Sequence, residues 1–109
     1  MQHKDKILVT KIIDEIDFAV GRIEKMSQNE FFEDIDAQHS VGMAVINVGE
    51  LTKHISDELR KEHKDIPWKE AAGFRDVAAH SYDTINMDDL YITIKIDFPK
   101  LKEKLDRLL

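Results

Sequence analysis

Residues 66–82 read IPWKEAAGFRDVAAHSY and carry the most unusual combination of side chains in this 109-residue chain. Asp65 offers a capping carboxylate just before the segment, and Pro67 fits the first turn of a helix, where its missing N–H is not needed. Glu70 places negative charge near the positive end of the helix dipole. The segment therefore predicts a helix that starts at Pro67 and runs to about residue 83. The rest of the chain is arranged around it.

A helical wheel, with about 100° per residue, sorts this segment onto two faces. The first face is apolar and predicts the side that packs in the core: Phe74, Val77 and Ala78, with Ala71 and Ser81 at its margins. The second face groups polar side chains with small ones: Arg75, Asp76 and His80, with Ala72, Gly73 and Ala79, and with Tyr82 two turns beyond Arg75. Glycine weakens a helix by about 1 kcal/mol. The missing bulk on the second face leaves room for another molecule to approach.

The polar residues of the second face suit phosphodiester chemistry. Asp76 and His80 are four residues apart, so they are neighbours on a helix, and a carboxylate beside an imidazole orients the ring for proton transfer. The planar guanidinium of Arg75 matches the oxygens of a phosphate. An alternative interpretation is that Asp76 and His80 form an exposed pair worth a few tenths of a kcal/mol, with Arg75 fully solvated.

The order Arg75, four residues, His80, one residue, Tyr82 resembles the Arg-x4-His-x-Tyr signature of the HEPN superfamily. The sequence before it is similar to the HepT branch of that superfamily, and the likeness covers most of the chain. Three segments carry it: Ile66-Pro67-Trp68, Gly73-x-Arg75-Asp76, and Val48-Gly49-Glu50, which resembles the family's Ile-Gly-Glu. Leu51 departs from the small residue usual in the family, and Asp76 stands where many relatives have Asn.

The resemblance implies an all-α, up-and-down antiparallel bundle of four to five helices that forms a homodimer. It also implies a metal-independent endoribonuclease without a cofactor, which cuts single-stranded or looped RNA where two copies of the motif meet. Arg75 and His80 would be the catalytic residues, and Asp76 and Tyr82 would support them. We therefore expect a ribonuclease of the HEPN type.

Members of the HepT branch are the toxin halves of HEPN/MNT toxin–antitoxin pairs. The resemblance thus implies a partner protein, a minimal nucleotidyltransferase of the MNT type, which binds the homodimer, and it leaves open whether the two form a higher hetero-oligomer. In this family the nucleotidyltransferase transfers AMP groups to a tyrosine and so silences the toxin. Tyr82 occupies the position of that tyrosine.

Composition indicates one domain, residues 1–109, with 42% apolar residues and a net charge of −6. This charge does not suit a protein that holds long nucleic acid by neutralising phosphates, so any RNA contact must be local. One basic cluster precedes the proposed site: Arg60, Lys61, His63, Lys64 and Lys69. It is equally well explained as the solvated end of a helix.

The chain contains no cysteine, which excludes disulfides and thiol catalysis and suits a reducing compartment. Charged residues occur throughout the N-terminal segment, which matches neither a signal peptide nor a membrane span. We therefore expect a soluble cytoplasmic protein with no membrane contact. No metal site is expected, because the helical pair of His54 and Glu58 lacks further ligands.

The N-terminal half predicts two long helices. Residues 4–26 repeat apolar side chains from Ile7 or Leu8 onward, through Ile12, Ile16, Ala19 or Val20, and Ile23 to Met26. Asn29 can cap a short turn that carries Phe31 and Phe32, which we interpret as core residues, with partner binding as the alternative. Asp34 or Asp36 then starts a second helix to about residue 62, with a core row of Val41, Val45, Val48, Thr52, Ile55 and Leu59.

Gly42 and Gly49 are seven residues apart and share one face of this second helix. Glycine costs helix stability, so two in register indicate close approach by another helix or another subunit. We expect this helix to help form the dimer.

Asn86 can cap the C-terminal helix, with Asp88 and Asp89 in its first turn. Residues 91–98 read YITIKIDF, and their alternation is typical of a strand. A helical row also runs through them: Leu90, Ile94, Phe98, Leu101, Leu105 and Leu108. A lone strand would have no partner, so we predict helix, broken or kinked before Pro99, with a last helix over 99–107.

Two other functions fit the same residues. The chain is a non-catalytic binding module that docks and regulates a nucleotidyltransferase, or it is a small nucleotide-binding bundle. An RNA-cleavage assay separates the first alternative from a ribonuclease, and titration with ATP or GTP exposes the second.

Overall fold

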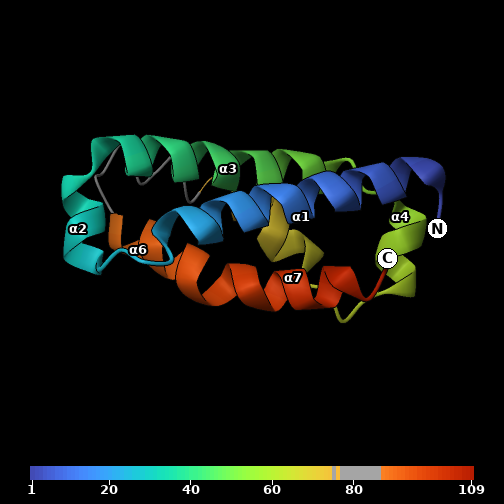
Figure 1. The fold of residues 1–109 in the computed structure, drawn as a ribbon. Coiled ribbons are helices and arrows are strands. Elements are labelled where there is room, and N and C mark those ends of the chain that lie inside the picture. The colour runs from blue at the N-terminus through green and yellow to red at the C-terminus, as the bar shows by residue number, and fades with distance from the viewer. Residues whose placement is uncertain (75, 77–86) are drawn as a thin grey trace.

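The computed structural model describes residues 1–74, 76 and 87–109, and every regular element in these ranges is a helix (Figure 1). The elements are α1 (His3–Ile23), α2 (Gln28–Glu33), α3 (Ile35–Lys53), α4 (Asp57–Glu62), a helical segment at 68–74, α6 (Met87–Ile92), the π-helical turn η1 (Thr93–Asp97) and α7 (Phe98–Asp106). The prediction of an all-α fold is confirmed for these residues. The choice of helix over strand for residues 91–98 is also confirmed.

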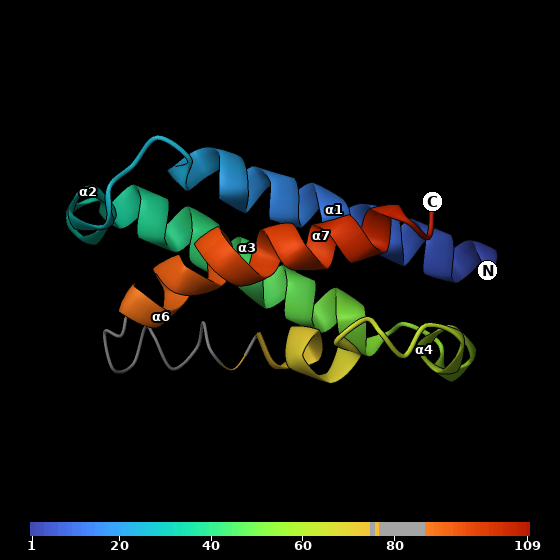
Figure 2. The same ribbon diagram turned by 90° about the horizontal axis from the view of Figure 1, so that it is seen from below.

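The long helices run up and down. α1 and α3 lie side by side and antiparallel, and α7 packs against α1 on its return (Figures 1 and 2). Both termini lie at the α4 end of the bundle, and α2 and α6 lie at the other end (Figure 1). No helix in the described ranges is both long and apolar enough to cross a membrane.

The buried face of α1 is a row spaced by alternating steps of four and three residues: Asp5, Val9, Ile12, Ile16, Ala19 and Ile23. The prediction for the row from Ile12 to Ile23 is confirmed, and of the two predicted starts Leu8 is partly buried against the core whereas Ile7 is not a core residue. Ile7 is 43% exposed, because a helix in phase with Ile12 turns Val9 and Asp5 to the core instead. The N-terminal turn therefore buries a carboxylate.

Ser27, and not Asn29, caps α2. Its hydroxyl accepts the backbone N–H of Glu30 at 3.1 Å, and the Glu30 carboxylate accepts the Ser27 N–H at 3.1 Å. This reciprocal pair is a capping box, which needs an acidic residue three positions after the cap. Phe31 is fully buried, as predicted, whereas Phe32 is 39% exposed and is not a core residue.

The predicted second helix is two helices. Asp34 caps α3 by accepting the N–H of Ala37 at 2.9 Å, as predicted, but α3 ends at Lys53 and α4 starts after Ser56. The Ser56 hydroxyl accepts the N–H of Leu59, which gives the backbone a cap where a continuous helix would need a carbonyl. The predicted core row stays buried on both sides of this break: Val41, Val45, Val48, Thr52, Ile55 and Leu59.

The C-terminal helix is not broken before Pro99. Asp88 and Asp89 lie in the first turn of α6, as predicted, and the cap predicted at Asn86 lies outside the described residues. The helix continues through η1, where the Phe98 N–H donates to the Thr93 carbonyl five residues back. This wider turn accommodates the position at which Pro99 has no N–H to donate. The predicted apolar row is buried from Leu90 to Leu105, and Leu108 is partly buried.

Candidate functional site

Of the four residues predicted to form the site, the structure describes Asp76. Arg75, His80 and Tyr82 lie outside the described residues, as does the predicted continuation of the helix over 77–83. The site is therefore built from the segment that leads into the motif and from the elements around it.

We call the helical segment at 68–74, which leads into the motif, the motif helix. It begins where the sequence predicts. Its first hydrogen bond runs from the Ala71 N–H to the Pro67 carbonyl at 2.9 Å, and Pro67 itself needs no acceptor. The loop before it is tied to α7, because the Lys104 ammonium donates to the Asp65 carbonyl at 2.7 Å. This hydrogen bond holds the loop that enters the motif helix against α7.

Trp68 anchors the start of the helix. Its side chain is 7% exposed, and its indole N–H donates to the His63 carbonyl at 3.0 Å. The apolar ring is thereby buried while its one polar atom is satisfied. Figure 2 shows this helical segment beside the C-terminal half of α3.

The two faces predicted for the motif helix are present in its described part. Ala71 and Phe74 are buried, and the Phe74 ring packs on the Phe98 ring with centroids 5.5 Å apart. Asp76 is exposed, and Ala72 and Gly73 are half-buried. A Cβ atom added to Gly73 would meet nothing within 4 Å, so there is open space in front of this residue. The helix is held by one face and presents Asp76 on another.

A groove of about 390 Å³ lies between the motif helix and α7. Its apolar walls are formed by Pro67, Phe74 and Leu101, and charged side chains such as Lys100 and Lys104 also line it. Asp76 follows Phe74 by two residues and so lies about 200° further around the helix. The groove is therefore on the core-facing side of the helix and does not belong to the face predicted to bind phosphate.

The basic cluster predicted ahead of the site is partly structural. Arg60 donates to the Thr52 carbonyl at 2.7 Å and to the Ile55 carbonyl at 3.3 Å, and so satisfies the end of α3. Lys61, Lys64 and Lys69 are exposed. Among the described residues of this cluster these lysines are left to meet an anion, and no sequence pattern separates Arg60 from them.

The described ranges contain no group of three or more His, Cys, Asp or Glu side chains that could hold a metal ion. Within those ranges the candidate site therefore consists of a carboxylate on an anchored helix, next to small residues and open space.

A family model described as HepT-like, "Ribonuclease HepT-like", matches residues 12–108. "Probable ribonuclease HepT" from Thermococcus cleftensis is 33% identical over 110 residues, which cover 97% of this chain and 94% of that protein. "Putative RNase TTE0752" from Caldanaerobacter subterraneus is 30% identical over 98 residues, which cover 90% of this chain and 88% of that protein. No solved structure matches the chain.

The family model spans nearly the whole chain, including every residue of the Arg75-x4-His80-x-Tyr82 motif. Both relatives are also aligned over nine-tenths or more of this chain. The chain belongs to the HepT-like ribonuclease family of the HEPN superfamily.

Proposed function

We propose that this protein is a metal-independent endoribonuclease that cuts RNA at a composite site between two copies of the chain. One observation carries the proposal: the complete Arg75-x4-His80-x-Tyr82 motif falls within the residues that match a ribonuclease family model. The relatives named as ribonucleases support the same activity.

RNA supplies its own nucleophile for this reaction. A base removes the proton of the 2′-hydroxyl, and that oxygen attacks the adjacent phosphorus. The bond to the 5′-oxygen of the next nucleotide breaks, which leaves a cyclic phosphate and, after protonation, a free 5′-hydroxyl. In the proposal His80 transfers protons, and Arg75 stabilises the charge that builds on the phosphoryl oxygens. Asp76 orients His80, and Tyr82 binds phosphate or a base.

The homodimer is part of the proposed mechanism. One chain offers a single motif imidazole, whereas the reaction needs both a base and an acid. Two copies that share a cleft supply two of each motif residue. The exposed position of Asp76 on a helix anchored by Trp68 and Phe74 supports this arrangement, because a second copy can reach that face.

The activity is tested with purified protein, a single-stranded RNA and a chelator. His80→Ala and Arg75→Ala are each expected to slow cleavage by about 100-fold or more. Lys11→Ala removes an exposed cation on α1, outside the basic cluster, and is expected to leave the rate unchanged. If either motif variant cuts as fast as the parent, the assignment of these residues is wrong.

We further propose that the protein is the toxin of a toxin–antitoxin pair, neutralised by an MNT-type nucleotidyltransferase that transfers AMP from ATP to the Tyr82 hydroxyl and releases pyrophosphate. The adduct would add a phosphodiester anion beside Arg75 and occupy the space needed by the substrate. Mass spectrometry of the chain after co-expression tests this step. An unmodified Tyr82 in a neutralised complex would show that the partner acts by binding alone.

A non-catalytic module that docks and regulates a nucleotidyltransferase is the second candidate. It is favoured by the net charge of −6 and by the exposed Asp76, since both repel RNA. Purified protein that cuts no RNA, with or without the His80→Ala change, would favour this function over the ribonuclease.

A further inference from the structure

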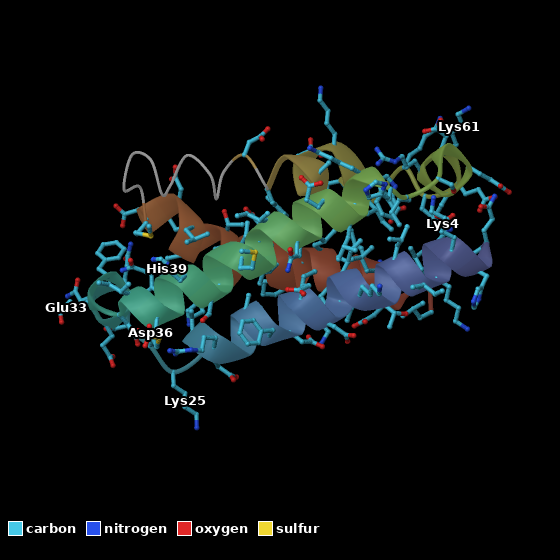
Figure 3. The ribbon with its side chains drawn as sticks, turned by 90° about the horizontal axis from the view of Figure 1, so that it is seen from above. Lys4, Lys25, Glu33, Asp36, His39 and Lys61 are labelled. Carbon is cyan, nitrogen blue, oxygen red and sulfur yellow. The ribbon has the colours of Figure 1, made fainter. Side chains whose placement is uncertain are left out.

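The negative charge of this protein is concentrated in one segment. Residues 26–52 contain five of the 22 acidic residues and none of the 16 basic ones, so the remainder of the chain is close to neutral. Figure 3 shows Glu33 and Asp36 at one end of the bundle, with Lys25 also at that end and Lys4 and Lys61 at the other. Gln28 donates to the Asp88 carboxylate at 2.5 Å, which brings the acidic first turn of α6 to the same end as Glu33.

A hollow of about 460 Å³ lies at this acidic end, where α2 meets α3. Four carboxylates and two apolar side chains line it: Glu30, Glu33, Asp34, Asp36, Met26 and Ile35. Two hydrogen bonds hold the junction of α2 and α3 that forms the hollow, since the Gln38 amide donates to the Phe31 and Phe32 carbonyls at 2.9 Å each. The hollow therefore combines apolar walls with a ring of negative charge.

The carboxylates of the hollow differ in what they already bind. Glu30 and Asp34 serve as helix caps, and the Arg22 guanidinium approaches Asp34 at 3.6 Å. Glu33 and Asp36 are exposed, and among the described residues neither makes a hydrogen bond or ion pair. These two carboxylates can take a cation without disturbing a cap.

Exposed apolar side chains adjoin the same carboxylates. Ile35 is 67% exposed, more than any other large apolar residue in the described ranges, and Phe32 is 39% exposed. Scattered apolar residues on a surface are ordinary, but Ile35 lines the charged hollow and Phe32 is next in sequence to Glu33, which also lines it. Covering Ile35 and Phe32 would bury apolar area next to a charge contact, which is the usual anatomy of a protein–protein interface.

Charge decides what covers this surface. Phosphate groups are repelled by it, so nucleic acid does not fit. Two copies related by a two-fold axis would bring Glu33 and Asp36 face to face, which disfavours a homodimer here. The opposite end of a second copy is also a poor match, because Lys61 and Lys64 are interspersed with Asp57 and Glu62. A different protein with a basic surface fits best.

We infer that the hollow between α2 and α3, with Ile35 and Phe32 beside it, is the docking surface for a partner protein that inserts a lysine or arginine side chain. The aliphatic stem of that side chain would lie against Met26 and Ile35, and its cation would meet Glu33 and Asp36. The inference rests on the proposed function, in which the partner is the nucleotidyltransferase. The bundle is 42 Å long, whereas salt screens charges over about 8 Å, so the surface acts only on what touches it.

Binding of the purified nucleotidyltransferase to this chain, measured by calorimetry at low and at high salt, tests the inference. Glu33→Lys combined with Asp36→Lys is expected to weaken binding by about tenfold or more and to flatten its salt dependence. Ile35→Ala is expected to weaken binding less and to leave the salt dependence as it was. RNA cleavage by both variants without the partner should equal that of the parent.

Asp57→Lys combined with Glu62→Lys is the matched control, because it reverses two exposed carboxylates on α4 at the other end of the bundle. Glu33→Gln combined with Asp36→Asn guards against helix destabilisation, since Asp36 lies in the first turn of α3. Equal binding by the parent, the reversed pair and the control overturns the docking surface and leaves the ribonuclease proposal intact. No binding by the parent overturns both the surface and the proposed partner.

Discussion

Asp5 and Ser56 join the first turn of α1 to the start of α4 across 51 positions of sequence. One oxygen of the Asp5 carboxylate accepts the Ser56 backbone N–H at 3.0 Å, and the other accepts the Ser56 hydroxyl at 2.5 Å. The same hydroxyl accepts the Leu59 N–H at 3.2 Å as the cap of α4. Asp5 is 1% exposed, so these contacts are what allow a carboxylate at the first position of the buried row of α1.

Asp5→Ala is expected to lower the free energy of unfolding by about 2–4 kcal/mol, because it removes two hydrogen bonds to a carboxylate and leaves the Ser56 N–H and hydroxyl without their acceptor. Asp5→Asn is expected to cost about 1 kcal/mol, since the amide oxygen still accepts one of these bonds. Urea unfolding measures both. Asp14→Ala on the exposed side of α1 serves as the control, and an equal effect of Asp5→Ala and Asp14→Ala would refute a stabilising role of the Asp5–Ser56 contact.

The sequence sufficed for the parts of the fold that depend on periodicity. The buried rows of α1, α3 and α7 follow from apolar residues three and four positions apart, because a helix places such residues on one face. The same rule placed Phe74 inside and Asp76 outside on the motif helix. For the candidate site, periodicity thus predicted which described residues of the motif helix are buried and which are exposed.

The features that the sequence did not reveal depend on contacts between distant segments. At the α3–α4 break Asp5 contacts Ser56, and no local pattern around Ser56 indicates that contact. The wide turn of η1 absorbs Pro99 without breaking the helix, because the row through Ile94 and Phe98 stays packed. Helix propensity predicts an irregularity at such positions, but tertiary packing determines whether the helix ends there or continues through a wider turn.

Trp68 allows a test of how firmly the motif helix is held. Trp68→Ala removes a buried indole and is expected to cost about 3–5 kcal/mol. Trp68→Phe keeps most of the apolar contact but removes one of two donors to the His63 carbonyl, which still accepts the Ile66 N–H at 3.2 Å, so a cost of about 0.5–1.5 kcal/mol is expected. Thermal and urea unfolding give these values. A Trp68→Phe protein as stable as the parent would show that the indole hydrogen bond adds nothing.

Lys102 and Asp17 link α7 to α1 through an exposed ion pair at 2.6 Å. The hydrogen bond to Asp17 raises the pKa of Lys102 above its usual 10.5. A raised lysine pKa means that the pair stabilises the folded state at neutral pH and that this contribution is lost as the pH rises through the folded-state value. At pH values below 10.5, Lys102→Gln should therefore cause a small decrease in the melting temperature. Well above pH 10.5 it should have no effect.

A pH series of melting curves compares Lys102→Gln with the parent and with Lys100→Gln, which changes an exposed lysine two residues away on the same helix. The gap between the Lys102 variant and the parent should close only in the alkaline range. A gap that stays constant across that range would mean that the side chain acts by packing instead of by charge.

Gly73→Ala separates the stability of the motif helix from its function. A Cβ atom at Gly73 meets nothing within 4 Å, and alanine is the better helix former, so the variant is expected to be more stable by about 0.5–1 kcal/mol. Gly21→Ala is the matched control: Gly21 lies on the exposed side of α1, also with open space before it, and the same gain is expected. If RNA approaches the motif over Gly73, then Gly73→Ala cuts RNA more slowly than Gly21→Ala, although both are stabilised alike. Equal cleavage by the two variants would mean that the open space at Gly73 takes no part in substrate binding.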